Sequence, residues 1–140
     1  MTREDKELLL KDLCARLPYG VKMNHIADDE HSPKTLIGVA KDMITLEGLG
    51  GYECIDVEDY KPYLFPLSSM TEARQEEFDR IYADDMQVVA NNLKNRLDGK
   101  PYETNLGHYR HIDWLNANNF DYRSLIPKGL AIDATGLNIY

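Results

Sequence analysis

Residues 111–131 read HIDWLNANNFDYRSLIPKGLA, and no other stretch of this chain packs so much rigid apolar area into so few positions. The stretch holds the only tryptophan, Trp114, and further large apolar side chains follow: Phe120, Tyr122, Leu125, Ile126 and Leu130. Large aromatic side chains dominate the energetics of protein cores and of interfaces alike. The stretch is therefore either a lid that closes a small core or a surface that grips a partner.

Two features of the same stretch favour the lid. Residues 111–118 have the pattern of a short helix, which ends at Asn118 and Asn119 because asparagine competes with helical backbone hydrogen bonds. Asp121 then stands where it can cap a following turn at 122–126. Two short capped turns that carry large apolar side chains are typical of a lid over a sheet.

A long helix is predicted at residues 70–97. Apolar side chains recur there every three or four residues, the period of an amphipathic helix: Phe78, Tyr82, Met86, Val89, Leu93 and Leu97. Ser69 with Glu72 resembles a capping box, and Asp98-Gly99 is a typical stop. At ~1.5 Å per residue the helix is about 40 Å long, which exceeds what a compact domain of this size needs.

The first half of this helix is rich in carboxylates: Glu72, Glu76, Glu77, Asp79, Asp84 and Asp85. Acidic residues in a first turn suit the helix dipole, but Asp84 and Asp85 lie in the middle of the helix. These side chains either serve a partner or solvate one face.

The N-terminal half predicts a small sheet with a helix beside it. Residues 2–17 have an apolar stripe at helical spacing, and Thr2 with Asp5 resembles a capping box. Four short strands are expected at 21–25, 35–40, 43–46 and 52–57, separated by polar or glycine-rich turns. Residues 58–67 contain Pro62 and Pro66, so we expect a proline-broken connector rather than a helix or a central strand. Residues 131–133 either form a last strand or belong to a free tail.

The fold class is therefore α+β. We expect a small curved antiparallel sheet or an SH3-like partial barrel at about 20–57, an N-terminal helix, the long helix and the C-terminal helical lid. The 140 residues fit a single domain over 1–140, made of the helix at 2–17, sheet and connector at 20–67, long helix at 70–98 and lid at 111–131.

The charge balance restricts the partners. The chain has 16 Lys+Arg and 24 Asp+Glu, a formal net charge of −8, which repels bare nucleic acid and anionic lipid and favours a protein with a basic surface. We expect no direct duplex binding and no membrane association. No run approaches the ~20 apolar residues that span a bilayer, and the charged N-terminus lacks a signal-peptide core, so a bacterial cytoplasmic location is expected.

The two cysteines, Cys14 and Cys54, stand in apolar sequence settings. They form one structural disulfide or, in a reducing compartment, remain as two buried free thiols, and the second alternative is favoured.

Catalytic signatures are missing from the sequence. It has no phosphate loop, G-x-S-x-G, CxxC or H-E-x-x-H motif, so we expect a non-enzymatic protein without a cofactor. His108, His111 and Asp113 form the one local cluster of metal-ligand type, and a metal-dependent hydrolase is the alternative it allows. Their spacing matches no established site, so capping and surface roles are the default.

The nine tyrosines favour a binding role, because tyrosine offers large contact area at little entropic cost. The candidates for contacting a partner protein are Glu76, Glu77, Asp84, Asp85, Tyr60, Tyr63, Tyr102 and Tyr109. A small-ligand or nucleotide-sequestering protein is the alternative, with Trp114 and Tyr122 stacking on a base and Arg110 or Arg123 holding phosphate. The stripe of the long helix also offers a surface for self-association.

Three segments resemble a group of small uncharacterised proteins from phages and integrated mobile elements of gut anaerobes. They are KELLLKDLCARLPYGVK at 6–22, VEDYKPYLFPLSSMTE at 57–72 and WLNANNFDYRSLIPKGLAI at 114–132. The long helix departs from the group near residues 76–97. The resemblance implies a phage or mobile-element protein, and with the acidic charge it suggests an inhibitor of a host defence or nucleic-acid-handling protein, of the anti-defence or anti-CRISPR type.

Overall fold

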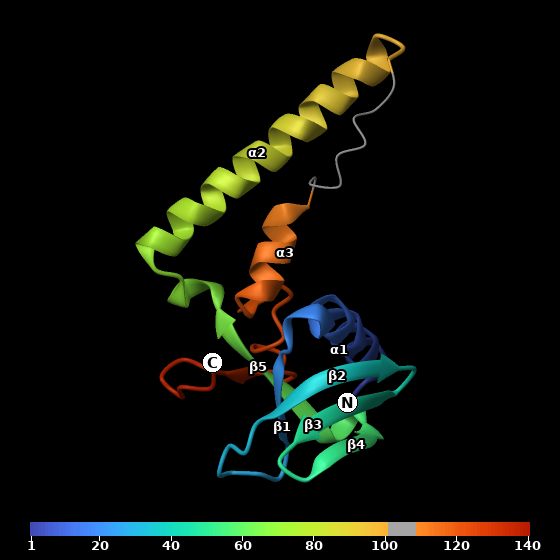
Figure 1. The fold of residues 1–140 in the computed structure, drawn as a ribbon, viewed down its shortest axis with the longest axis vertical. Coiled ribbons are helices and arrows are strands. Elements are labelled where there is room, and N and C mark those ends of the chain that lie inside the picture. The colour runs from blue at the N-terminus through green and yellow to red at the C-terminus, as the bar shows by residue number, and fades with distance from the viewer. Residues whose placement is uncertain (101–108) are drawn as a thin grey trace. The chain divides into compact units, whose positions relative to one another are not determined.

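The computed structural model describes residues 1–100 and 109–140 and divides the chain into two compact units. Unit 1 combines Met1–Ser69 with Asn116–Tyr140, and unit 2 is Met70–Leu115. The described residues form an α+β fold with three α-helices and a seven-stranded mixed sheet (Figure 1). The single domain that the chain length predicts stays a prediction, and the two units are described in turn.

The sheet of unit 1 is open, with neighbouring strands in the order β4-β3-β2-β1-β5-β6 and β7 on β5. Its strands are β1 (Lys22–His25), β2 (Lys34–Ala40), β3 (Met43–Gly48), β4 (Gly51–Asp56), β5 (Tyr60–Pro66), β6 (Phe120–Asp121) and β7 (Ile132–Asp133). The first four pair antiparallel with one another, as expected, and β5 also pairs antiparallel with β1, whereas β6 and β7 pair parallel with β5. The four N-terminal strands and the short last strand therefore match the sequence pattern closely.

The prediction for residues 58–67 was wrong, because β5 is a central strand. It pairs with β1 at Tyr60 to Pro62 and with β7 and β6 at Tyr63 to Pro66. Pro62 is the last residue of the ladder with β1, and Pro66 is the last residue of the ladder with β6. A missing backbone N–H costs least where a ladder ends, so both prolines are accommodated.

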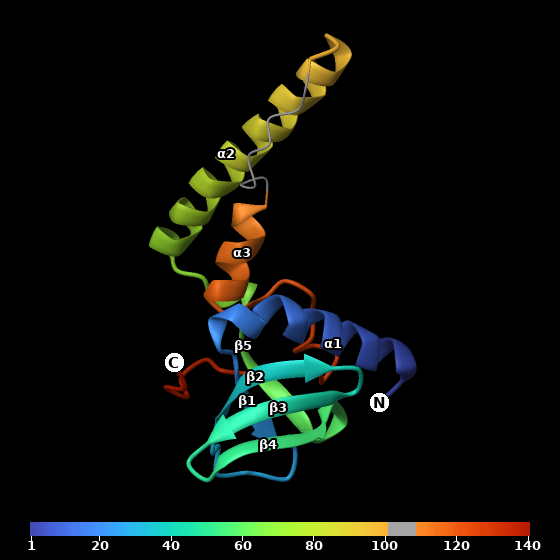
Figure 2. The ribbon, with the colours of Figure 1, turned by 45° about the vertical axis from the view of Figure 1, so that its right-hand side comes forward.

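Helix α1 (Arg3–Arg16) packs on the sheet, as the stripe predicts (Figure 2). The Thr2 hydroxyl accepts a hydrogen bond of 3.1 Å from the Asp5 backbone N–H and caps its first turn. Leu9 and Leu13 are fully buried in the core of unit 1. The main strand-borne partners in that core are Met23, Leu36, Ile44, Leu46, Tyr60 and Leu64, and Val21 joins them from just before β1.

The C-terminal segment of unit 1 is the lid, but a shorter one than predicted. Leu125, Leu130 and Ala131 belong to the core cluster. Asp121 accepts hydrogen bonds from the backbone N–H groups of Leu125 (2.9 Å) and Ile126 (2.8 Å), so the predicted cap is present. The first part of the predicted lid, up to Leu115, belongs to unit 2 instead.

Unit 2 consists of two helices among its described residues. They are α2 (Glu72–Leu97) and α3 (Arg110–Ala117), whose last two residues already count to unit 1. The N-cap of α2 is Thr71, whose side chain accepts from the Arg74 N–H, so the predicted capping box at Ser69 was placed two residues early. The Ser69 hydroxyl donates to the Pro66 carbonyl at 2.7 Å instead.

The thiols of Cys14 and Cys54 are free, and both residues are exposed. The prediction of buried thiols was wrong, because each cysteine lies on the outward side of an element whose neighbours fill the core. In the described part of the chain, no helix has the length and apolar character required to cross a membrane.

Candidate functional site

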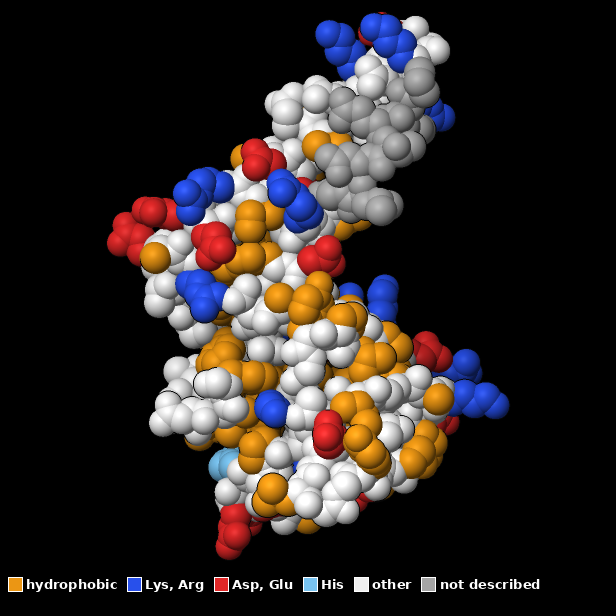
Figure 3. Space-filling model, viewed as in Figure 1, with side chains coloured by type: hydrophobic (Ala, Val, Ile, Leu, Met, Phe, Trp, Pro, Cys, Tyr) orange, Lys and Arg blue, Asp and Glu red, His pale blue; other side chains and the backbone are white. Residues whose placement is uncertain are grey.

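The first half of α2 presents carboxylates to solvent. Glu76, Glu77 and Asp84 are exposed, as expected for candidates that contact a partner. Between Glu72 and Asp85 the helix carries six carboxylates and two arginines, whereas its last turn is basic. Figure 3 shows acidic side chains near the start of α2 and basic ones at its far end. The helix therefore has a marked charge gradient along its axis.

Asp85 was wrongly predicted to contact a partner, because its side chain is buried. One oxygen accepts hydrogen bonds from the His111 backbone N–H (2.8 Å) and contacts His111 Nδ1 (2.6 Å). The other accepts from Arg110 Nε at 3.4 Å. Burial raises the pKa of Asp85, but the hydrogen bonds from His111 and Arg110 outweigh burial and hold that pKa below its ordinary value. Asp85 thus joins the start of α3 to the middle of α2.

Aromatic rings surround this carboxylate–imidazole pair within unit 2. The Tyr82 ring lies edge-on to the His111 ring at 5.1 Å between centroids, and the Phe78 ring lies 6.2 Å from it. Trp114 packs on Phe78 at 5.7 Å, with the Arg74 guanidinium 5.9 Å from the indole. The tryptophan, predicted to plug the core beneath the lid, therefore stabilises the contact between α2 and α3.

Two of the tyrosines predicted to contact a partner are core residues. Tyr60 and Tyr63 are buried because β5 is central, and the Tyr63 hydroxyl lies 2.7 Å from His31 Nδ1. The Tyr60 hydroxyl lies between Lys34 and Glu53, at 3.2 and 3.3 Å. Tyr109 is 67% exposed, as expected of a contact residue. Tyr102 lies outside the described residues.

The two arginines proposed to hold phosphate are both engaged by carboxylates. Arg123 donates to Asp12 at 3.0 Å and its guanidinium lies 4.7 Å from the centre of the Tyr122 ring. Arg110 lies 3.6 Å from Asp84 and 3.4 Å from Asp85. The stacking and phosphate-binding residues of the nucleotide alternative therefore already contact one another or other parts of the protein.

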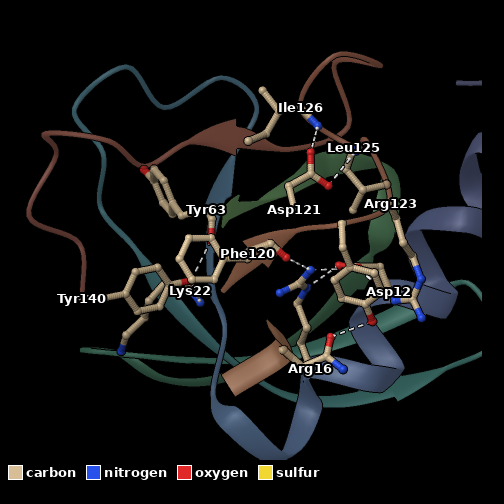
Figure 4. A network of polar contacts seen from close by, with 12 residues as sticks. Asp12, Arg16, Lys22, Tyr63, Phe120, Asp121, Arg123, Leu125, Ile126 and Tyr140 are labelled. Carbon is tan, nitrogen blue, oxygen red and sulfur yellow. Dashed lines mark hydrogen bonds and ion pairs between the residues drawn. The ribbon is translucent and has the colours of Figure 1, made fainter. Parts of the chain in front are cut away.

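Arg123 belongs to a buried polar network in unit 1 (Figure 4). Asp12 is fully buried and binds Arg16 through two hydrogen bonds, of 2.7 and 3.2 Å. Arg16 also donates to the Phe120 carbonyl at 2.7 Å, which ties α1 to β6. One carboxylate thus binds two arginines, and the position of Arg123 follows from the fold rather than from a ligand.

The candidates for metal binding are not brought together among the described residues. The ring of His111 is engaged by Asp85, Asp113 is exposed, and His108 lies outside the described residues. No group of three or more histidine, cysteine or acidic side chains suited to a metal ion occurs in residues 1–100 and 109–140.

Sequence reasoning missed the Asp85–His111 pair and the Asp12–Arg16–Arg123 network. Only Asp12 and Arg16 stand at the four-residue spacing that marks an ion pair on a helix.

Comparisons with protein-family models, with curated proteins and with solved structures yield no match to this chain.

Proposed function

We propose that this is a non-enzymatic binding protein of a phage or mobile element, which docks the acidic first half of α2 onto the basic surface of a host defence or nucleic-acid-handling protein. The observation that carries the proposal is the exposure of Glu76, Glu77 and Asp84 on one rigid helix. Carboxylates arrayed in this way imitate the repeated negative charge of a nucleic-acid backbone and steer a basic partner into contact.

The pairing of the candidate arginines with carboxylates of the chain supports the same proposal. The arginines that a nucleotide site requires, Arg110 and Arg123, are neutralised by carboxylates of the chain itself. Arg110 also lies 3.6 Å from Asp84, but the six carboxylates between Glu72 and Asp85 still outnumber the cations beside them, which in sequence are Arg74 and Arg80. The free charge of unit 2 is therefore negative, and its natural complement is a basic protein surface.

The test removes three negative charges from α2. The variant Glu76→Gln/Glu77→Gln/Asp84→Asn is immobilised and compared with the wild type for retention of basic nucleic-acid-binding proteins from a bacterial host extract. The matched control, Asp29→Asn/Glu30→Gln/Glu47→Gln, removes three charges from exposed positions of unit 1. We expect the wild type and the control to retain the same partner, with retention decreasing as salt rises, and the α2 variant to lose it.

The retained protein is then assayed for nucleic-acid binding. The wild type should compete with nucleic acid for this partner, and the α2 variant should not. Equal retention by all three proteins, or a rise in melting temperature with one class of nucleotide in the absence of any partner, would refute the proposal.

A further inference from the structure

Helix α2 carries an apolar stripe that runs beside the side that meets α3 and shares Tyr82 with it. The stripe consists of Tyr82, Met86, Val89, Leu93 and Leu97, spaced four, three, four and four residues apart. Four of its side chains are strongly exposed: Tyr82 46%, Val89 42%, Leu93 58% and Leu97 80%. From Tyr82 to Leu93 the spacings alternate between four and three residues, as in a coiled-coil seam, and Leu97 lies one residue beyond the next position of that pattern.

The contacts with α3 are made mainly by a neighbouring side of the helix. Asp85, which binds His111, is buried three residues after Tyr82 and four before Val89. At 100° per residue, Asp85 lies about 60° from Tyr82 around the helix axis. Val89 and Leu93 lie within about 20° of Tyr82. Tyr82 touches His111 with one edge and leaves nearly half of its surface exposed. The stripe therefore remains available beside the α2–α3 contact.

The charges beside the stripe indicate which partner binds it and in which orientation. Residues 72–85 carry six carboxylates and two arginines, a net charge of −4, and residues 86–100 carry two lysines, one arginine and one aspartate, a net charge of +2. A second copy of α2 that runs parallel would place like charges side by side. A second copy that runs antiparallel places each acidic half against a basic half, so the helix is complementary to itself in one orientation only.

We propose that the protein forms a two-fold symmetric dimer through antiparallel α2 helices. In the register that stacks the stripe, Tyr82 packs on Leu93 of the second copy and Met86 packs on Val89 of the second copy. The same register places Asp79 opposite Arg96 of the second copy, and by symmetry this pair occurs twice. A surface that pairs with itself across a two-fold axis closes the assembly at two copies.

The first test is the mass in solution. Sedimentation equilibrium of the full chain from low to high micromolar concentration should show a monomer–dimer equilibrium. Leu93→Glu should weaken the dimer at least about tenfold, because it buries a charge in the seam. Gln87→Glu, which adds the same charge at an exposed position off the stripe, should leave it unchanged. Circular dichroism checks that each variant keeps its helix content.

The second test uses the pair of Asp79 and Arg96 to determine the relative orientation of the two α2 helices. Asp79→Arg and Arg96→Asp should each weaken the dimer by placing like charges together, and the double variant should restore it. In a cysteine-free background, Cys14→Ser/Cys54→Ser, a mixture of Tyr82→Cys and Leu93→Cys chains should cross-link to each other, while each variant alone should cross-link poorly. A monomer at every concentration, a dimer indifferent to Leu93→Glu, or cross-links within a single variant would overturn the proposal.

Discussion

Among the single residues of unit 1, Asp12 is the one whose carboxylate binds two arginines. Its carboxylate and the Arg16 guanidinium are both fully buried, and Arg123 depends on the same carboxylate. Taking charges out of water is costly, and the cost is offset only while the opposite charge stays in place. The network is therefore a point where the removal of one group leaves a buried cation without its counter-ion.

We accordingly expect Asp12→Ala to destabilise unit 1 by about 3–5 kcal/mol, as measured by urea denaturation followed by far-UV circular dichroism. The control is the double variant Asp12→Leu/Arg16→Met, which replaces the buried pair with apolar side chains. Because it removes the fully buried Arg16 guanidinium together with its counter-ion and leaves only the partly exposed Arg123 without one, the double variant should be more stable than the single one. The reverse order would show that the ion pair is not the source of the effect.

Asp85 should make the stability of the fold depend on pH in acid. The pKa of this carboxyl is lowered from its ordinary value of 3.8 by the bonds that it accepts. A carboxyl whose folded pKa is depressed stabilises the fold above the unfolded pKa and loses this contribution as pH falls through the folded pKa. We therefore expect Asp85→Asn to lower stability at neutral pH.

The measurement compares wild type and Asp85→Asn by urea denaturation at a series of pH values. The difference in unfolding free energy should be constant near neutrality and should shrink once pH falls below about 4. A difference that grows with acid, or one that does not depend on pH, would contradict the assignment of Asp85 as an ionised partner of His111 and Arg110.

Single residues also mark what the sequence could not predict. The pair Asp85 and His111 is separated by 26 positions, and no local pattern links a mid-helix carboxylate to one particular histidine. The four-residue spacing of Asp12 and Arg16 is one that indicates an ion pair on a helix. Arg123, by contrast, stands 111 positions from Asp12. Such pairings are fixed by tertiary packing, so the parts of the candidate site that depend on them could not be derived from local sequence.

At the scale of elements, caps and hydrophobic period predicted the helices and four N-terminal strands well. The presence of two prolines does not exclude strand β5, because each proline stands where a ladder ends. The ladders on the two sides of β5 cover different halves of the strand and end at the prolines. The same central position buries Tyr60, Tyr63 and Leu64 without alternation, a pattern typical of strands covered on both faces.

The contact between α2 and α3 supplies an element-scale prediction. Trp114 packs on Phe78 and Arg74 but is only partly buried. We therefore expect Trp114→Ala to cost about 2 kcal/mol, less than the 3–5 kcal/mol of a fully buried tryptophan. Hydrogen exchange should quicken in α2 and remain unchanged in β2 and β3.

Trp114→Phe is the matched control, because it keeps an aromatic ring against Phe78 and should preserve most of the protection in α2. Faster exchange in the strands of unit 1 after Trp114→Ala would instead return the tryptophan to the lid over the sheet.

At the scale of the whole molecule, unit 2 is an insertion in unit 1. The chain leaves unit 1 after Ser69 and re-enters it at Asn116. The exit and the re-entry are close together, because Phe65 near the end of β5 is the register partner of Phe120 at the start of β6. The core of unit 1 draws only on the segments before and after the insertion.

We expect unit 1 to fold alone when residues 70–115 are replaced by a flexible linker of about eight residues, which spans roughly 15 Å. Its proton–nitrogen NMR spectrum should show well-dispersed amide signals, and thermal unfolding should be a single cooperative transition. A spectrum with collapsed amide dispersion would show that unit 2 is required for the sheet to form.

The parallel pairing of β5 with β6 and β7 also means that one edge of β5 cannot pair until much later residues have been synthesised. When β5 leaves the ribosome, one of its edges still lacks its partners, since β6 pairs with residues 55 positions before it and β7 with residues 69 positions before it. At 5–20 residues per second, the nascent chain waits roughly 3–14 s before those partners exist. During that interval an apolar strand edge is open to other nascent chains, so heterologous expression at low temperature, where translation is slower still, should depend on a chaperone that shields this edge.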